Sequence, residues 1–229
     1  LLLKINKTKA IDMKTINNKN IVTFLLSLIF CSTINAQTTI IFQPNGSQGK
    51  DAFIESRLNN NNYGNHIDFP AMSWTNRGTP VDARGLIDFD LSNIPNGATI
   101  DSASLSLYSY SSPANGSNST QDGSNRSVLT RITNSWDEST VTWNNQPTTT
   151  TQNQVFLPAS TNSIQDYLNI DVTNLVQDMI INSNSSYGFL LKLVTEQYYR
   201  KMIFASSDNA DSTMHPKLEV TFTEATQYN

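Results

Sequence analysis

The sequence predicts an all-β protein, an antiparallel sandwich or barrel with one short helix. Apolar and polar residues alternate with a period of two in several short stretches. Stretches rich in Asn, Ser, Gly and Pro, which favour turns, separate them. Many short strands at this spacing are typical of antiparallel sandwiches and barrels.

The amino-terminal segment predicts export from the cell. Met13 is followed by two lysines, an apolar run at 21–30 and a small residue before Gln37, the order found in secretory signal peptides. The apolar run is shorter than the roughly 20 residues that a membrane-spanning helix needs. We therefore interpret residues 1–12 as upstream readthrough and 13–36 as a cleaved signal peptide, and we expect a secreted protein at the cell surface or beyond it.

Removal of this leader leaves an acidic domain without cysteine. Cys31 is the only cysteine, and the remaining chain has ten basic and eighteen acidic residues, a formal net charge of −8. This charge argues against binding to nucleic acid or to anionic membranes, and no later stretch is apolar enough to span a membrane. We expect one sandwich domain over 37–224 and interpret 225–229 as a truncated tail. The chain would then be a fragment of a longer protein with a catalytic or adhesin domain.

The alternating pattern predicts seven strands, and a polar run without alternation separates the third from the fourth. In 103–110, Ala103, Leu105 and Leu107 alternate with serine and tyrosine, so they are expected to face the core. The polar run 111–126 that follows is expected to be a mobile loop tip. The predicted strands are 51–56, 84–91, 103–110, 127–133, 187–194, 201–206 and 217–222.

One segment has helical spacing instead. It predicts a short amphipathic helix near 173–182 that closes one end of the sandwich, with Asp171 or Thr173 as its cap. The apolar face consists of Leu175, Val176, Met179 and Ile180.

The segment 135–147, SWDESTVTWNNQP, has three interpretations: half of a glycosidase site, an aromatic sugar platform, or a strand that anchors the sandwich. Asp137 and Glu138 are adjacent, so on a strand they would point to opposite faces. The two carboxylates of a glycosidase must instead converge at roughly 5–10 Å. Val141 and Trp143 would alternate inward. We therefore favour the anchoring strand.

Seven phrases resemble, in chain order, the DNRLRE domain, which also underlies carbohydrate-binding module family 96. They are GKDAFIES, NYGN, RGLIDFDLSNIPNGATIDSASLSLY, RITNSWDESTVTWNNQP, DVTNLVQ, SSYGFLLKL and HPKLEVTF. The resemblance covers residues 41–223 and implies an antiparallel jelly-roll β-sandwich that binds carbohydrate. His215 stands where the family usually has arginine, so a role of that arginine does not carry over.

The sequence contains no recognisable catalytic motif. His66 and His215 lie in turn-like stretches without a metal-binding partner at i+2 or i+4, and we expect both on the surface. Neither a nucleophile elbow nor a zinc-protease motif occurs. We therefore expect a protein that is not an enzyme.

Sugar binding requires exposed aromatic faces together with planar hydrogen-bonding groups. Three of the cations expected on polar strand positions can line one sheet face, and the aromatic candidates lie in the loop SWTNRG and in the stretch EQYYRK. The alternative for Arg84 and Arg131 is pairing with Asp88 or Asp90 across the sheet. The ligand-binding candidates are Trp74, Arg84, Arg131, Lys192, Tyr198, Tyr199 and Arg200.

Three carboxylates suggest a structural calcium ion, the only cofactor that the sequence indicates. Asp51 opens the first predicted strand, and Asp208 and Asp211 precede the last one. If these strands lie close together, the carboxylates can supply some of the six to eight oxygens that Ca²⁺ requires. The alternative is that Asp208 and Asp211 cap a loop by bonding their own backbone.

These observations predict a non-catalytic, secreted carbohydrate-binding module whose partner is a polysaccharide. The resemblance supplies this ligand class and favours a uronate-containing, alginate-like chain. One alternative is a structural or adhesive cell-surface module. A weaker alternative is a polysaccharide lyase or hydrolase.

Overall fold

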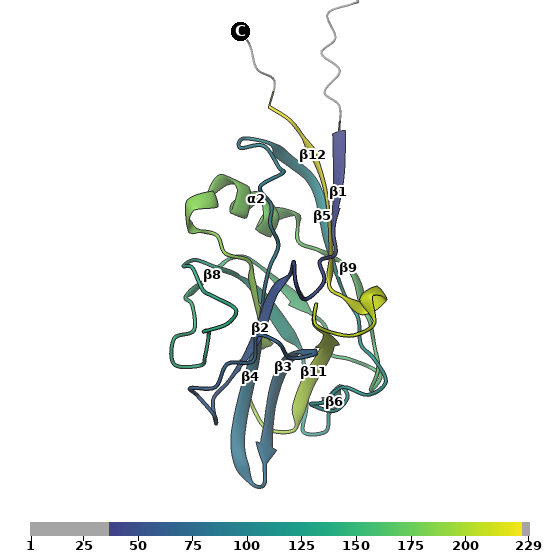
Figure 1. The fold of residues 1–229 in the computed structure, drawn as a ribbon. Coiled ribbons are helices and arrows are strands. Elements are labelled where there is room, and N and C mark those ends of the chain that lie inside the picture. The colour runs from purple at the N-terminus through teal and green to yellow at the C-terminus, as the bar shows by residue number, and fades with distance from the viewer. Residues whose placement is uncertain (1–36, 226–229) are drawn as a thin grey trace, which may run out of the picture. The chain divides into compact units, whose positions relative to one another are not determined.

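The computed structural model describes residues 37–225, which form two antiparallel β-sheets and one α-helix (Figure 1). Residues of both sheets meet in one apolar core, so the all-β sandwich is confirmed. The expected signal peptide (13–36), the segment 1–12 and residues 226–229 of the tail lie outside the described residues. Within 37–225, no helix is long and apolar enough to cross a membrane.

The smaller sheet contains four strands, all paired in antiparallel fashion. Their order across the sheet is β1 (Gln37–Phe42), β12 (Lys217–Thr223), β5 (Thr99–Leu107) and β9 (Tyr167–Asp171). The first and last strands of the described chain are therefore hydrogen-bonded neighbours, with Gln37 opposite Thr223.

The larger sheet contains eight strands. Its path runs through β6 (Ser119–Thr120), β11 (Arg200–Ala205), β3 (Asp68–Asn76), β4 (Thr79–Asp88), β10 (Phe189–Leu193), β7 (Ser127–Ile132) and β8 (Thr149–Leu157), and β2 (Lys50–Glu55) also pairs with β4. The β3–β4 hairpin turns at Arg77 and Gly78, whose φ angles of 51° and 81° suit a two-residue turn between twisted strands.

The helix α2 (Thr173–Ile181) packs against β5 and β8 and adds its apolar face to the core (Figure 1). Its buried positions include all four residues that the sequence assigned to this face. Asp171 Oδ1 accepts a hydrogen bond from the backbone N–H of Thr173 at 3.0 Å, which satisfies an amide of the first turn. The predicted helix is thus confirmed, but its N-cap residue is Val172, which makes no side-chain cap bond, and not Asp171 or Thr173; Asp171 precedes the cap and binds the first helical amide.

The larger sheet carries apolar side chains on its second face as well. Leu86 and Leu190 belong to a separate cluster, whereas their neighbours Ile87 and Leu191 belong to the core between the sheets. Successive strand residues point to opposite faces, so this second cluster lies on the outer side of the sheet. Its cover is the segment 133–148, called the tryptophan loop here, which contributes Trp136 and Val141 and the half-buried Trp143.

The tryptophan loop is not the strand that its sequence predicted. Asp137 Oδ1 accepts a hydrogen bond from the N–H of Ser139 at 2.9 Å, and Asn145 Oδ1 accepts one from the N–H of Thr142 at 2.6 Å. Such side-chain bonds to the local backbone compete with strand pairing and favour turns. The anchoring role remains, because Trp136 is only 9% exposed and its Nε1 donates to the Tyr187 carbonyl at 2.9 Å.

Each of the seven predicted strands overlaps an observed one. Among the observed strands that were not predicted, β3 and β8 show no alternation of buried and exposed residues. In β3 the first six residues are all buried and Pro70 interrupts the run of amide donors. In β8 most residues are exposed or half-buried, and only Leu157 is fully covered. Neither strand shows the alternation of buried and exposed residues that is typical of a sheet with one solvent-exposed face.

The polar run 111–126 is held against the sheet, contrary to the expected mobile loop tip. Asp68, a buried residue of β3, accepts hydrogen bonds at Oδ2 from the backbone N–H of Asn115 at 2.7 Å and from its side-chain amide at 2.8 Å. Asn125 is fully buried and donates to Ser160 Oγ at 2.7 Å. Two buried polar side chains therefore fix this segment at both of its ends.

Replacing Trp136 by alanine should lower the free energy of unfolding by about 3–5 kcal/mol, because it opens a cavity and leaves the Tyr187 carbonyl without its donor. Trp143→Ala should cost clearly less, since Trp143 is only half-buried. Denaturant unfolding of both variants, followed by circular dichroism, measures the difference. A larger loss for Trp143→Ala would contradict this assignment.

Candidate functional site

Three aromatic side chains meet at the end of β3 and in the connection between β10 and β11. The Trp74 and Tyr199 rings lie edge to face, with centroids 5.1 Å apart and an interplanar angle of 89°. Tyr198 extends this group, with its centroid 6.4 Å from that of Tyr199. Trp74 and Tyr199 are half-buried, whereas Tyr198 is 42% exposed. Together with Lys201, these residues are called the tyrosine patch.

The pairing of β3 with β11 places these side chains together. Arg200 lies opposite Ser73, and the two strands are antiparallel. Tyr199, one residue before Arg200, therefore lies beside Trp74, one residue after Ser73. Tyr199 has a φ of 65°, a left-handed conformation that is costly for a bulky residue. Trp74 belongs to β3 and not to a loop, so the sequence prediction for its local structure was wrong.

Lys201 supplies a cation to the tyrosine patch. Its Nζ lies 4.6 Å from the centroid of the Trp74 ring and donates a hydrogen bond to the Asn115 carbonyl at 2.6 Å. Burial lowers the pKa of Lys201 from its usual value, and the charge of Asp68 opposes this shift. The ammonium group is therefore held in place beside an aromatic face.

Arg200 contacts the loop after β6 and not the aromatic rings of the tyrosine patch. Its Nε and one terminal nitrogen donate to the Asp122 carbonyl at 2.8 and 2.5 Å, which ties β11 to the loop after β6. The residue as a whole is half-exposed.

The three cations expected to line one sheet face do not form a common surface. Arg84 makes two parallel hydrogen bonds to Glu196, each of 2.7 Å, donates to Gln146 Oε1 and lies 4.5 Å from the centroid of the Trp143 ring. Lys192, on β10 and opposite Val128, is half-buried.

Arg131 is 6% exposed and donates to the Ser185 carbonyl and to Ser186 Oγ, both at 2.8 Å. The alternative that Arg84 and Arg131 pair with Asp88 or Asp90 was wrong, because Arg84 pairs with Glu196 and Arg131 binds neutral groups. Asp88 instead forms an ion pair with Lys50 at 3.0 Å.

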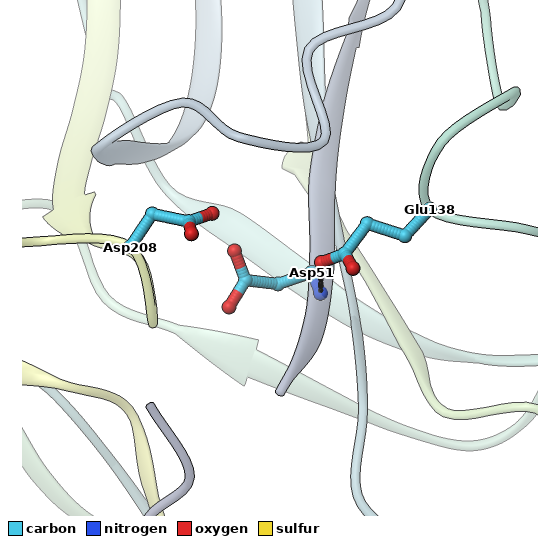
Figure 2. A group of neighbouring side chains, drawn as sticks. All are labelled: Asp51, Glu138 and Asp208. Carbon is cyan, nitrogen blue, oxygen red and sulfur yellow. Dashed lines mark hydrogen bonds between the residues drawn. The ribbon is translucent and has the colours of Figure 1, made fainter. Parts of the chain in front are cut away.

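A second group consists of carboxylates from three distant segments. Asp51 comes from β2, Glu138 from the tryptophan loop and Asp208 from the connection between β11 and β12, and one oxygen from each lies within 4.8 Å of the others. Figure 2 shows the carboxylates of Asp51 and Asp208 facing each other, with Glu138 reaching Asp51 from the other side. These three residues are called the acidic cluster.

Hydrogen bonds fix the position of Asp51 within this cluster. Its backbone N–H donates to Glu138 Oε1 at 2.8 Å, the dashed line of Figure 2, and its Oδ2 accepts from the N–H of Ser207 at 2.8 Å. Asp51 is 1% exposed, and burial raises its pKa to about 6. Burial is also the main cause that raises the pKa values of Glu138 and Asp208, and the nearby charges of the cluster add to the rise for Asp51 and Glu138.

Sequence reasoning assigned two of these three carboxylates and missed Glu138. Asp211, the third expected ligand, lies outside the cluster: its Oδ1 accepts from the N–H of Thr213 at 3.0 Å, so it caps a short 3₁₀ helix (Ser212–Met214). The bonds from the Thr213 hydroxyl and then from its N–H lower the pKa of Asp211. His215 is 4% exposed and its Nε2 lies 2.8 Å from the Asn209 carbonyl, so the expectation of a surface histidine was wrong.

A cleft of about 740 Å³ lies beside α2. Its lining includes the Lys50–Asp88 ion pair and the helix residues Met179 and Ile180. Among the described residues that line it, the only aromatic side chain is Phe89, which is buried. The cleft therefore lacks an exposed ring against which a sugar could stack.

Comparison with known proteins gives one family. The model of carbohydrate-binding module family 96 matches residues 45–222, a range that includes the tyrosine patch and the acidic cluster. No curated protein matches the chain.

The Arg84–Glu196 pair should behave as part of the fold. A double-mutant cycle with Arg84→Ala and Glu196→Ala should give a coupling energy of about 1–2 kcal/mol in denaturant unfolding, because the bonds are parallel and the groups partly buried. A coupling energy near zero would show that Arg84 remains free for a ligand.

Proposed function

The chain belongs to carbohydrate-binding module family 96, and on this premise we propose that it holds a polysaccharide against the tyrosine patch, outside the cell. Binding without turnover is the role of such a module. The apolar run at 21–30, which has the character of a signal peptide, supports a secreted protein.

The observation that carries this proposal is the exposed ring of Tyr198 beside Trp74 and Tyr199. Sugar rings present apolar C–H faces and a rim of hydroxyl groups, so a suitable partner combines an aromatic face with hydrogen-bonding groups. Tyr198 and Tyr199 provide both in one side chain. The contact of Tyr199 with Trp74 holds the platform rigid, which reduces the entropy lost on binding.

We infer that the ligand is a uronate-containing, alginate-like polysaccharide. Lys201 lies beside the aromatic ring of Trp74, and cations of this kind bind carboxylates. The net charge of residues 37–229 is strongly negative, so the attraction of a negatively charged polysaccharide must come from cations at the patch itself. Such an interaction weakens as salt rises.

The carboxylates of the chain support binding without catalysis. Asp51 is almost fully buried, so the acidic cluster does not flank a surface where a glycosidic bond can lie. Asp137 is exposed, and its Oδ1 accepts the N–H of Ser139 within its own turn. A pair of accessible, converging carboxylates, which glycoside hydrolysis requires, is absent from this loop.

Tyr198→Ala should weaken binding to sodium alginate about 2–10-fold, the loss expected when one aromatic contact is removed. Phe156→Ala is a matched control, because Phe156 is also 42% exposed, also has a cation near its ring, and lies on β8, far across the sheet order from β11. Affinity gel electrophoresis of the full chain compares the variants. Equal retardation of wild type and Tyr198→Ala would contradict the tyrosine patch as the binding surface.

If the ligand is anionic, raising sodium chloride from 50 to 500 mM should weaken alginate binding, and Lys201→Gln should reduce both affinity and its salt dependence. Binding to the neutral glucan laminarin serves as the comparison, and Lys217→Gln, on the smaller sheet, serves as the control variant. Affinity for laminarin that exceeds affinity for alginate and does not respond to salt would identify a neutral ligand instead.

A further inference from the structure

The acidic cluster has no ion-pair partner within the described residues, although the charges of Lys50, His66 and His215 partly oppose the rise that burial causes in its pKa values. The ion pairs there join Lys50 to Asp88, Arg57 to Glu55 and Arg84 to Glu196, and none includes a member of the cluster. Three carboxylates within a few ångströms repel one another, and burial of Asp51 strengthens the repulsion by reducing solvent screening. A positive charge at this place would relieve the repulsion and stabilise the ionised carboxylates.

Two buried oxygen atoms at the cluster lack a hydrogen-bond partner among residues 37–225. One is Oδ2 of Asp208 and the other is the hydroxyl of Ser207, a residue that is only 2% exposed. The Ser207 hydroxyl lies beside the Asp51 carboxylate, whose pKa it helps to lower. Buried polar atoms are almost always paired, so these two oxygens, one from the cluster and one next to it, indicate a ligand that both atoms contact.

The backbone leaves no room for side chains around these oxygens. A β-carbon at Gly46 would overlap Oδ1 of Asp208, and one at Gly49 would overlap the hydroxyl of Ser207. The turn 45–49 therefore packs directly on the oxygens, and only glycine permits this approach.

We propose that Asp51, Glu138 and Asp208 bind a calcium ion, with the Ser207 hydroxyl as a further ligand. Each carboxylate keeps at least one oxygen that accepts no hydrogen bond from the described residues, and Asp208 keeps both. Oxygens on opposite sides of Ca²⁺ lie at most about 4.6–5.2 Å apart, which matches the observed limit of 4.8 Å. The oxygen-only ligand set and the number of carboxylates favour calcium over softer metals.

The ion would join three segments that are far apart in the chain. β2, the tryptophan loop and the β11–β12 connection each supply one carboxylate. Its effect is structural and independent of the proposed glycan, because the tyrosine patch contains no member of the acidic cluster.

The test uses the full chain after removal of metal with a chelator and dialysis. Calcium chloride should raise the midpoint of thermal unfolding by roughly 5–10 °C at saturation, because the ion binds the folded state only. Competition with a chromophoric chelator should give one site per chain.

Asp208→Asn should abolish both effects, and without calcium it should melt at or above wild type, because one repelling charge is gone. The control Asp211→Asn removes an exposed acid outside the cluster and should respond to calcium as wild type does.

Three results would overturn the proposal: no calcium binding by wild type up to 10 mM, an equal response from Asp208→Asn, or an equal response to magnesium at the same concentration. The wild-type binding measurement decides the matter even if a variant fails to fold. Alginate binding that persists in Asp208→Asn would leave the proposed function intact, so the two proposals can fail separately.

Discussion

A sheet with apolar side chains on both faces needs a cover on each of them, and the larger sheet of this protein is such a sheet. One face packs on the smaller sheet and α2, which together form the main core. The other face, around Leu86 and Leu190, packs under the tryptophan loop. The loop is therefore required for the sandwich itself, and its two tryptophans are explained by burial and stacking without reference to a ligand.

The same loop determines what the nearby charged residues do. It places Trp143 against Arg84, whose guanidinium group is fully engaged by Glu196 and Gln146, and it delivers Glu138 to the amide of Asp51. Charges near the loop thus serve contacts within the fold. Away from the loop, the connection after β10 leaves Tyr198 exposed next to Tyr199, and this is the surface that we propose for a glycan.

The sequence was sufficient for the sandwich and for α2, because each depends on a local pattern of apolar and polar residues. β3 and β8 were missed because one is buried on both faces and the other on almost none, so neither alternates. Glu138 was missed for a different reason. It is adjacent to Asp137, and on a strand the two side chains would point to opposite faces. The segment is not a strand, because Asp137 and Asn145 bind the local backbone and form turns. The burial of Arg131 and His215 follows from contacts between distant segments, which single-sequence periodicity does not encode.

The pairing of β1 with β12 has a mechanical consequence. Residues 37 and 223 lie opposite each other at one end of the pair, and the register runs from there to Phe42 opposite Leu218. Tension applied between residues 37 and 223 would therefore break the inter-strand hydrogen bonds one after another, like a zipper, and not all together in shear. Beyond Phe42 and Leu218, the opening would next reach the bond from Gln43 to the His215 carbonyl and then Asp51 and Asp208, which approach each other from the two sides. Under load, such a module would therefore yield first along this edge at low force, while the larger sheet stays folded.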